Sequence, residues 1–236
     1  MDNYVTTIDT SIVQWTNTES KDERNAQIIS SKVQTWLNEK DLSKAVTLDY
    51  QEDKEYWLAI DNEVLVYNYE NGCYSLLNLS DKITVFITYQ GIIYAGTENG
   101  KIIEFDKNVT AYDGQVIKAE WQSGYYDFGA EEQRKTMRVL WITLKPWFKT
   151  SLDINYISDR DSGSEAKTIE KRSISYAHWN YARFTYNTQR SVKPFRVKLK
   201  AKKFAFLKLI LKNEASDEKV TVNSIAIKKV YGGEVK

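Results

Sequence analysis

The chain has 236 residues, 42% of them apolar and 13% aromatic, which is enough for a packed core in one large or two small domains. A single histidine and a single cysteine exclude a histidine-cluster metal site, an internal disulfide and a multi-cysteine metal site. The net charge of +1 conceals two opposite halves: residues 1–118 hold 10 Lys and Arg against 19 Asp and Glu (net −9), and residues 119–236 hold 23 against 13 (net +10). Such asymmetry bears on partners rather than on fold.

Residues 1–44 are predicted to form a strand, a loop and one amphipathic helix. The strand covers Ser11–Trp15 and the polar loop covers Thr16–Arg24. The helix is expected over Asn25–Lys40, because apolar residues recur there at spacings of about three and four. They are Ile28, Ile29, Val33, Trp36 and Leu37. The first ten residues lack the pattern of a secretory signal, and no apolar run reaches the roughly 20 residues of a membrane span, so we expect synthesis in a cytoplasm and no membrane partner.

Residues 45–118 are expected to form two units of four short strands each. The first unit contains AVTLDY, YWLAI, EVLVYNY and CYSLLNL, with Asn71-Gly72 as a type I′ hairpin turn. The second contains ITVFITY, IIYAGT, KIIEFD and VIKAEWQ. When the two units are aligned, Ala59 falls opposite Ala95 and Tyr67 falls opposite Phe105. These separations are close to the roughly 40 residues of a propeller blade. Successive hairpins of an ordinary antiparallel meander fit the same pattern.

Residues 119–236 carry longer strands separated by polar loops. MRVLWITLKPW, SLDINYISD, the basic segment VKPFRVKLKAKKFAFLKLILK and VTVNSIAIKKVY are the strand candidates. In the segment MRVLWITLKPW both strand faces are partly apolar, as expected in a two-layer structure. The sequence therefore predicts an all-β protein with one short N-terminal helix, in which blade-like antiparallel strands precede a β-sandwich over 119–236, with a domain boundary around 115–122.

The clearest candidate for an interaction site is a row of cations within the basic segment. Arg196, Lys198, Lys200 and Lys202 alternate with Val197, Leu199 and Ala201, which places the four charges on one strand face. Such a face would neutralise phosphates without reading bases if nucleic acid passed by. A solvated outer face, or contact with a neighbouring subunit, explains the same pattern.

Other chemistry-bearing residues receive ordinary structural interpretations. His178 is expected at the sandwich surface or packed beside Trp179, and Cys73 as a half-buried structural thiol. Asp159, Asp161 and Glu165 share one loop, yet their order departs from the calcium-loop pattern, which favours a solvated loop. Motifs for nucleotide phosphates are absent, so no cofactor is expected.

Aromatic residues gather in two segments. GYYDFG (124–129) and SYAHWNYARFTY (175–186) could stack sugars or bases, although core packing and subunit contact are the simpler explanations. A glycosidase would need two carboxylates on one concave surface, and no segment combines an acid with the convergent polar groups of such a site. The sequence indicates no catalytic or metal-binding residues, and the protein is expected not to be an enzyme.

From Gln27 onward, the order of segments resembles a known group of proteins. EYWLAIDNEVLVYNYENGCY, GIIYAGTENGKIIEFD and AEWQSGYYDFGAEEQRKTMRVLWITLKPWFKTSLDINYISDRD are followed by the lysine-rich strand and SIAIKKVYGGEVK. This series is similar to the C-terminal part of bacteriophage tail or head-to-tail connector proteins, including the nozzle-like and DNA-stabilisation proteins of short-tailed phages. Members of that group are usually longer and have more blades before this region.

The resemblance implies a non-enzymatic structural protein of the virion, synthesised in a bacterial host. It implies copies arranged in a ring in the tail or head-tail connector, contact with other virion proteins, and a part in the DNA passage. An acidic half facing the basic half of the next copy would favour head-to-tail closure of such a ring. Non-specific contact of the basic face with DNA is the competing use. The alternative function is a carbohydrate- or receptor-binding module of a phage tail.

Overall fold

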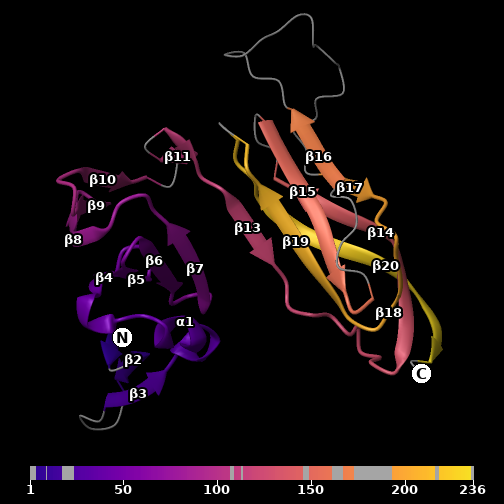
Figure 1. Ribbon diagram of the computed structural model, residues 1–236, viewed down its shortest axis with the longest axis horizontal. Coiled ribbons are helices and arrows are strands. Elements are labelled where there is room, and N and C mark those ends of the chain that lie inside the picture. The colour runs from indigo at the N-terminus through magenta and orange to yellow at the C-terminus, as the bar shows by residue number, and fades with distance from the viewer. Residues whose placement is uncertain are drawn as a thin grey trace, which may run out of the picture. The chain divides into compact units, whose positions relative to one another are not determined.

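The computed structural model is built almost entirely of antiparallel strands and contains one short α-helix among the residues it describes (Figure 1). The described residues are 4–8, 10–17, 24–106, 109–112, 114–145, 149–160, 167–172, 193–215 and 218–234. The chain divides into two compact units, Met1–Lys107 and Asn108–Lys236, here called the N-terminal and C-terminal units. This division falls earlier in the chain than the boundary around 115–122 that the sequence predicts.

The N-terminal unit begins with a three-stranded sheet, and the last strand of this sheet overlaps the start of the expected helix. Strands β1 (Tyr4–Ile8), β2 (Ser11–Asn17) and β3 (Arg24–Ile28) form this N-terminal sheet, followed by the 3₁₀ turn η1 (Ser30–Lys32) and the helix α1 (Gln34–Asn38). The prediction of a helix over Asn25–Lys40 is therefore wrong for its first half. Residues Arg24–Ile28 pair with β2 instead, and this pairing between strands outweighs the helical periodicity of the local sequence.

The middle sheet is the first predicted blade-like unit. A second 3₁₀ turn, η2 (Leu42–Lys44), leads into four strands that pair in chain order. They are β4 (Val46–Tyr50), β5 (Glu55–Ile60), β6 (Glu63–Asn68) and β7 (Cys73–Asn78). The turn at Asn71-Gly72 has the predicted position but not the predicted type. Only Gly72 has a positive φ there, and the Asn68 side chain accepts hydrogen bonds from the backbone N–H groups of Glu70 and Asn71.

The two faces of the middle sheet are covered differently. One face packs against the N-terminal sheet and α1, burying Tyr56, Leu58 and Leu37 in a shared core. Alternate residues of the same strands face the other way, and there Trp57 makes edge-on contacts with Phe86 and Phe105 of the next sheet, with ring centroids 6.2 and 5.0 Å apart. The sheet is therefore an inner layer of the unit.

The next sheet, here called the end sheet, has three strands instead of the four predicted. They are β8 (Ile83–Tyr89), β9 (Ile92–Thr97) and β10 (Ile102–Phe105). The expected fourth strand, VIKAEWQ, is divided between two other places. Its start contributes to a small hairpin of β11 (Ala111–Tyr112) and β12 (Gln115–Val116), and its end is β13 (Ala119–Gln122), which pairs with β19 of the sandwich.

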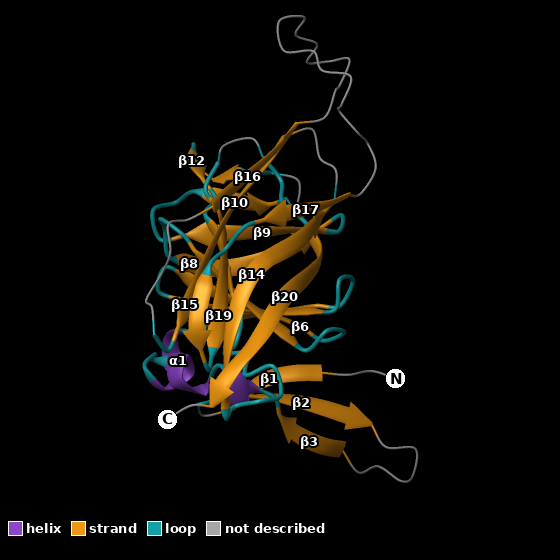
Figure 2. Ribbon diagram, turned by 90° about the vertical axis from the view of Figure 1, so that its right-hand side faces the viewer, coloured by secondary structure: helices purple, strands orange, loops and turns teal. Residues whose placement is uncertain are grey.

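The C-terminal unit contains the predicted β-sandwich (Figures 1 and 2). Its first sheet has the order β13-β19-β15-β16, with β15 over Lys149–Ser158, β16 over Lys167–Arg172 and β19 over Leu207–Asn213. Its second sheet is centred on the long strand β14 (Gln133–Leu144). Along one edge β14 pairs with β17 (Lys193–Val197) and β18 (Ala201–Phe204), and along the other with β20 (Val222–Glu234).

Alternation along the strands explains how the sandwich is filled. Leu140, Ile142 and Leu144 of β14 point inward against Ile154 and Leu209 of the opposite sheet, all at or near complete burial. The neighbouring residue Trp141 points outward, between its cross-strand partners Arg196 and Ala226. The inner faces thus form one core, and the outer face of the second sheet presents an aromatic ring beside a cation.

Candidate interaction surfaces

The structure places all four predicted cations of the basic face at the surface. Arg196, Lys198, Lys200 and Lys202 are exposed, whereas the intervening Val197, Leu199 and Ala201 are buried. The expected alternation is confirmed, but the segment is not one strand. Residues 198–200 separate β17 from β18, and both strands pair with β14. None of the four cations forms an ion pair with the described part of the chain.

The charge asymmetry of the sequence coincides with the division into two compact units. The N-terminal unit holds 9 Lys and Arg against 18 Asp and Glu, net −9, and the C-terminal unit holds 24 against 14, net +10. The opposite charges therefore belong to two separately packed bodies. The net charges of the two units therefore differ in sign.

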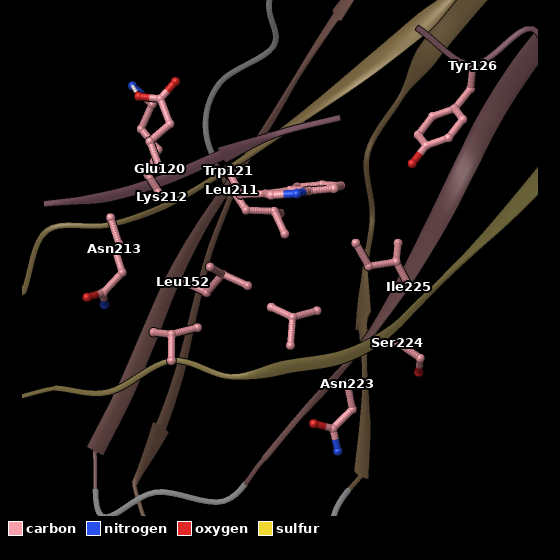
Figure 3. Close-up of a pocket in the computed structure, with 13 residues that line it drawn as sticks. Glu120, Trp121, Tyr126, Leu152, Leu211, Lys212, Asn213, Asn223, Ser224 and Ile225 are labelled. Carbon is pink, nitrogen blue, oxygen red and sulfur yellow. Dashed lines mark ion pairs between the residues drawn. The ribbon is translucent and has the colours of Figure 1, made fainter. Parts of the chain in front are cut away.

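A second candidate surface is a cleft at the side of the sandwich, where the edge strands β13 and β20 border the opening between the sheets (Figure 3). Its volume is about 590 Å³, within the range of small-molecule sites. The Trp121 side chain points into this cleft over Leu211, its cross-strand partner. Leu152 and Ile225 line the apolar floor, and Trp121 remains 47% exposed.

Polar groups lie at the margin of the Trp121 cleft. The Lys212 Nζ is 2.8 Å from Glu120 Oε2, and this hydrogen bond lowers the pKa of the Glu120 carboxyl and raises the pKa of the Lys212 ammonium. Asn213 donates from Nδ2 to the Ser151 carbonyl oxygen at 2.8 Å, while its Oδ1 accepts no hydrogen bond from the described residues. Asn223 adds a second amide. The cleft thus joins an apolar floor to an amide-bearing rim, and Glu120 is the one carboxylate among its lining residues.

The aromatic segment 124–129 is divided between core and surface. Phe128 packs on Phe204 with ring centroids 6.2 Å apart, and the Lys229 Nζ lies 4.6 Å from its ring centre. Tyr125 is exposed, with the Lys208 Nζ 5.9 Å from its ring centre. These rings do not form one flat platform. The second predicted aromatic segment, 175–186, lies outside the described residues, as do His178 and Trp179.

Asp159 has a structural role in the sandwich. Its Oδ1 accepts hydrogen bonds from the backbone N–H groups of Ala205 at 2.8 Å and Phe206 at 3.2 Å, and Arg134 Nη1 lies 3.6 Å from its Oδ2. The carboxylate therefore fixes the bend between β18 and β19. Asp161 and Glu165 lie outside the described residues. No group of three or more potential metal ligands occurs in the described part of the chain.

Cys73 corrects one sequence-based expectation. The thiol was expected to be half-buried, but the residue is exposed at the start of β7, with its Sγ 3.4 Å from the Asn71 carbonyl oxygen. The reason is the position of β7 at the edge of the middle sheet, where four of its six residues are exposed.

Sequence reasoning missed two features that the structure brings out. Trp121 was assigned to a blade strand, although its place between the polar Glu120 and Gln122 marks it as the inward residue of an edge strand. The outer face of the end sheet was also missed, because a strand that is apolar on both faces predicts burial on both.

Comparisons with known proteins leave the protein without an assigned family. No family model matches the sequence, and neither does any curated protein. Among solved structures, the exo-β-1,3-galactanase of Phanerochaete chrysosporium with galactose aligns over 96% of this chain and 68% of its own, at 6% identity and a TM-score of 0.27. A single-substitution variant of that enzyme with β-1,3-galactotriose aligns over the same shares at 7% identity and a TM-score of 0.24. At these scores the likeness supports no statement about function. No helix of the described chain is long and apolar enough to cross a membrane.

Proposed function

We propose that this protein is a non-enzymatic structural component of a bacteriophage virion that assembles into a ring in the tail or head-tail connector and forms part of the DNA passage. The resemblance of its segment order to such proteins suggests the setting. The observation that carries the proposal is the charge of the two compact units, −9 and +10.

Opposite charge on two bodies of one chain favours a particular kind of assembly. In a cyclic oligomer each copy presents one surface to one neighbour and a different surface to the other. An acidic unit that meets the basic unit of the next copy attracts it, whereas contacts between like units are repelled. The charge division therefore favours head-to-tail contacts over symmetric pairing of like units.

Sedimentation velocity at two salt concentrations tests the proposal. At about 20 mM salt, where the Debye length exceeds about 20 Å, we expect an oligomer. At about 1 M salt the screening length falls to about 3 Å, and we expect dissociation toward the monomer. A monomer under both conditions would reject the ring.

Carbohydrate binding is a second candidate function, favoured by the Trp121 cleft. An exposed indole above an apolar floor offers a face on which the apolar side of a sugar ring can stack, and the amides of Asn213 and Asn223 can bond its hydroxyl groups. A glycan array with wild type and Trp121→Ala distinguishes this function. Binding that the substitution abolishes supports it, and an array without any signal rejects it.

A further inference from the structure

The outer face of the end sheet is an exposed apolar surface within the N-terminal unit. Phe86, Ala95 and Phe105 share the face that turns toward Trp57, so their neighbours along each strand point the other way. These outward residues are here called the apolar face. They are Val85, Ile87, Tyr89, Ile92, Tyr94 and Ile102.

The exposure of the apolar face is high for residues of this kind. Ile87 is 60% exposed and Ile102 is 81% exposed, and Val85 and Tyr89 are more than half exposed. The only charged residue in the three strands is Glu104, which also points outward. Contiguous apolar patches of this size on a soluble protein commonly mark an interaction site. The inner strands β5 and β6 of the middle sheet, by contrast, are covered on both faces.

We infer that the apolar face docks onto the outer face of the second sandwich sheet of a neighbouring copy. That face carries Trp141 flanked by Arg196, with Ala226 and Lys228 on the adjacent strand. Arg196 and Lys228 are exposed, and neither forms an ion pair with the described part of the chain. The inference rests on the proposed function, because it names the surfaces through which the ring would close.

Charge complementarity selects this occupant. The strands that carry the apolar face contain one acid, Glu104, and no base, and they belong to a unit of net charge −9. The outer face that bears Trp141 carries cations and belongs to a unit of net charge +10. Two apolar faces of different copies would instead bring like-charged units together. The favoured contact is therefore heterologous, joining different surfaces of the two copies.

The apolar face is too small to form a stable interface alone, so charged groups around it must contribute to binding. Three strands about 4.8 Å apart and about 20 Å long cover roughly 300 Å². A stable interface buries about 800 Å² per partner, with an apolar centre and a polar rim. The apolar face can supply the centre and the surrounding charges the rim, so the contact should weaken as salt rises.

Single-surface variants and their mixture test the inference by sedimentation velocity at about 20 mM salt. Ile87→Lys places a cation at the centre of the apolar face, and Arg196→Glu reverses the charge beside Trp141. We expect each variant alone to lose self-association by on the order of tenfold or more. In an equimolar mixture each variant still has one intact surface, so heterodimers should form and larger species should not.

Leu76→Lys is the matched control, because Leu76 is exposed on β7 of the middle sheet and the substitution adds the same charge away from the apolar face. It should assemble like wild type. Thermal unfolding by circular dichroism confirms that each variant is folded, and Ile102→Lys replaces Ile87→Lys if the latter does not fold.

The outcomes separate the inference from the function on which it rests. A wild type that assembles together with an Ile87→Lys variant that assembles equally well overturns the interface and leaves the ring intact. Variants that fail to form heterodimers when mixed overturn the heterologous contact in favour of like-to-like pairing or docking within one chain. A wild type that is monomeric at low and high salt overturns the proposed function itself.

Discussion

At the scale of single residues, Asp81 shows how one carboxylate fixes two loops. Its side chain accepts hydrogen bonds from Asn99 Nδ2 at 2.6 Å and from Lys101 Nζ at 3.0 Å, although the residue itself is buried. These contacts join the start of the end sheet to the turn between β9 and β10. Hydrogen bonds from Asn99 and from Lys101 lower the pKa of the Asp81 carboxyl in the folded protein.

The lowered pKa of Asp81 predicts a contribution to acid sensitivity. Because the folded-state pKa lies below the unfolded value, the stabilisation is complete above that unfolded value and is lost as pH falls through the folded pKa. We expect the urea midpoint of the wild type to fall from about pH 5 to about pH 3 more steeply than that of Asp81→Asn. Equal slopes for the two proteins would contradict the prediction.

At the scale of elements, the short helix α1 matters more than its five residues suggest. Leu37 is completely buried in the core that the helix shares with the middle sheet. Trp36 adds an indole hydrogen bond to Glu63 at 3.0 Å, and Lys40 an ion pair with the same carboxylate at 2.7 Å. A helix this short is not stable alone, so these contacts hold it in place.

Truncating Leu37 tests the packing of α1 on the middle sheet. We expect Leu37→Ala to lower the free energy of unfolding by about 2–4 kcal/mol, through lost burial and an unfilled cavity. Leu76→Ala, at an exposed position of the same unit, should change it by less than about 1 kcal/mol. Denaturant unfolding followed by tryptophan fluorescence measures both, and equal losses would show that the helix does not anchor the sheet.

The same elements show how far the sequence predicts the fold. Strand alternation predicted that both faces of the segment that forms β14 are partly apolar. It also predicted the exposed cations of the basic face, because each of these patterns depends only on the local period of two. The spacing of Ile28, Ile29, Val33, Trp36 and Leu37 predicted one apolar helical side. Leu37 is buried, but Asn25–Ile28 belongs to a strand and Ile28 is exposed. The strand at Asn25–Ile28 forms because it pairs with β2, and Trp121 belongs to the sandwich because β13 pairs with β19. Both pairings join segments that are distant in the sequence, so the local residue pattern does not predict them.

At the scale of the whole molecule, the basic face has two possible partners that exclude each other. If a neighbouring copy covers Arg196, the cations around it are unavailable to DNA, whereas in a monomer they can neutralise phosphates. Self-association and DNA binding should therefore compete. Such competition would also suit the proposed DNA passage, since a channel lined with free cations would bind the duplex tightly.

The competition predicts how DNA binding depends on assembly. At protein concentrations where the wild type assembles, we expect the monomeric Ile87→Lys variant to bind duplex DNA more tightly per copy than Leu76→Lys, which carries the same added charge. A gel shift across a salt series measures this, and both affinities should fall steeply as salt rises because released counterions drive the binding. Replacing Arg196, Lys198, Lys200 and Lys202 with glutamine in the Ile87→Lys background should remove the gain. Equal affinities of the two lysine variants would mean that the face bound by DNA and the face bound by the neighbouring copy are different.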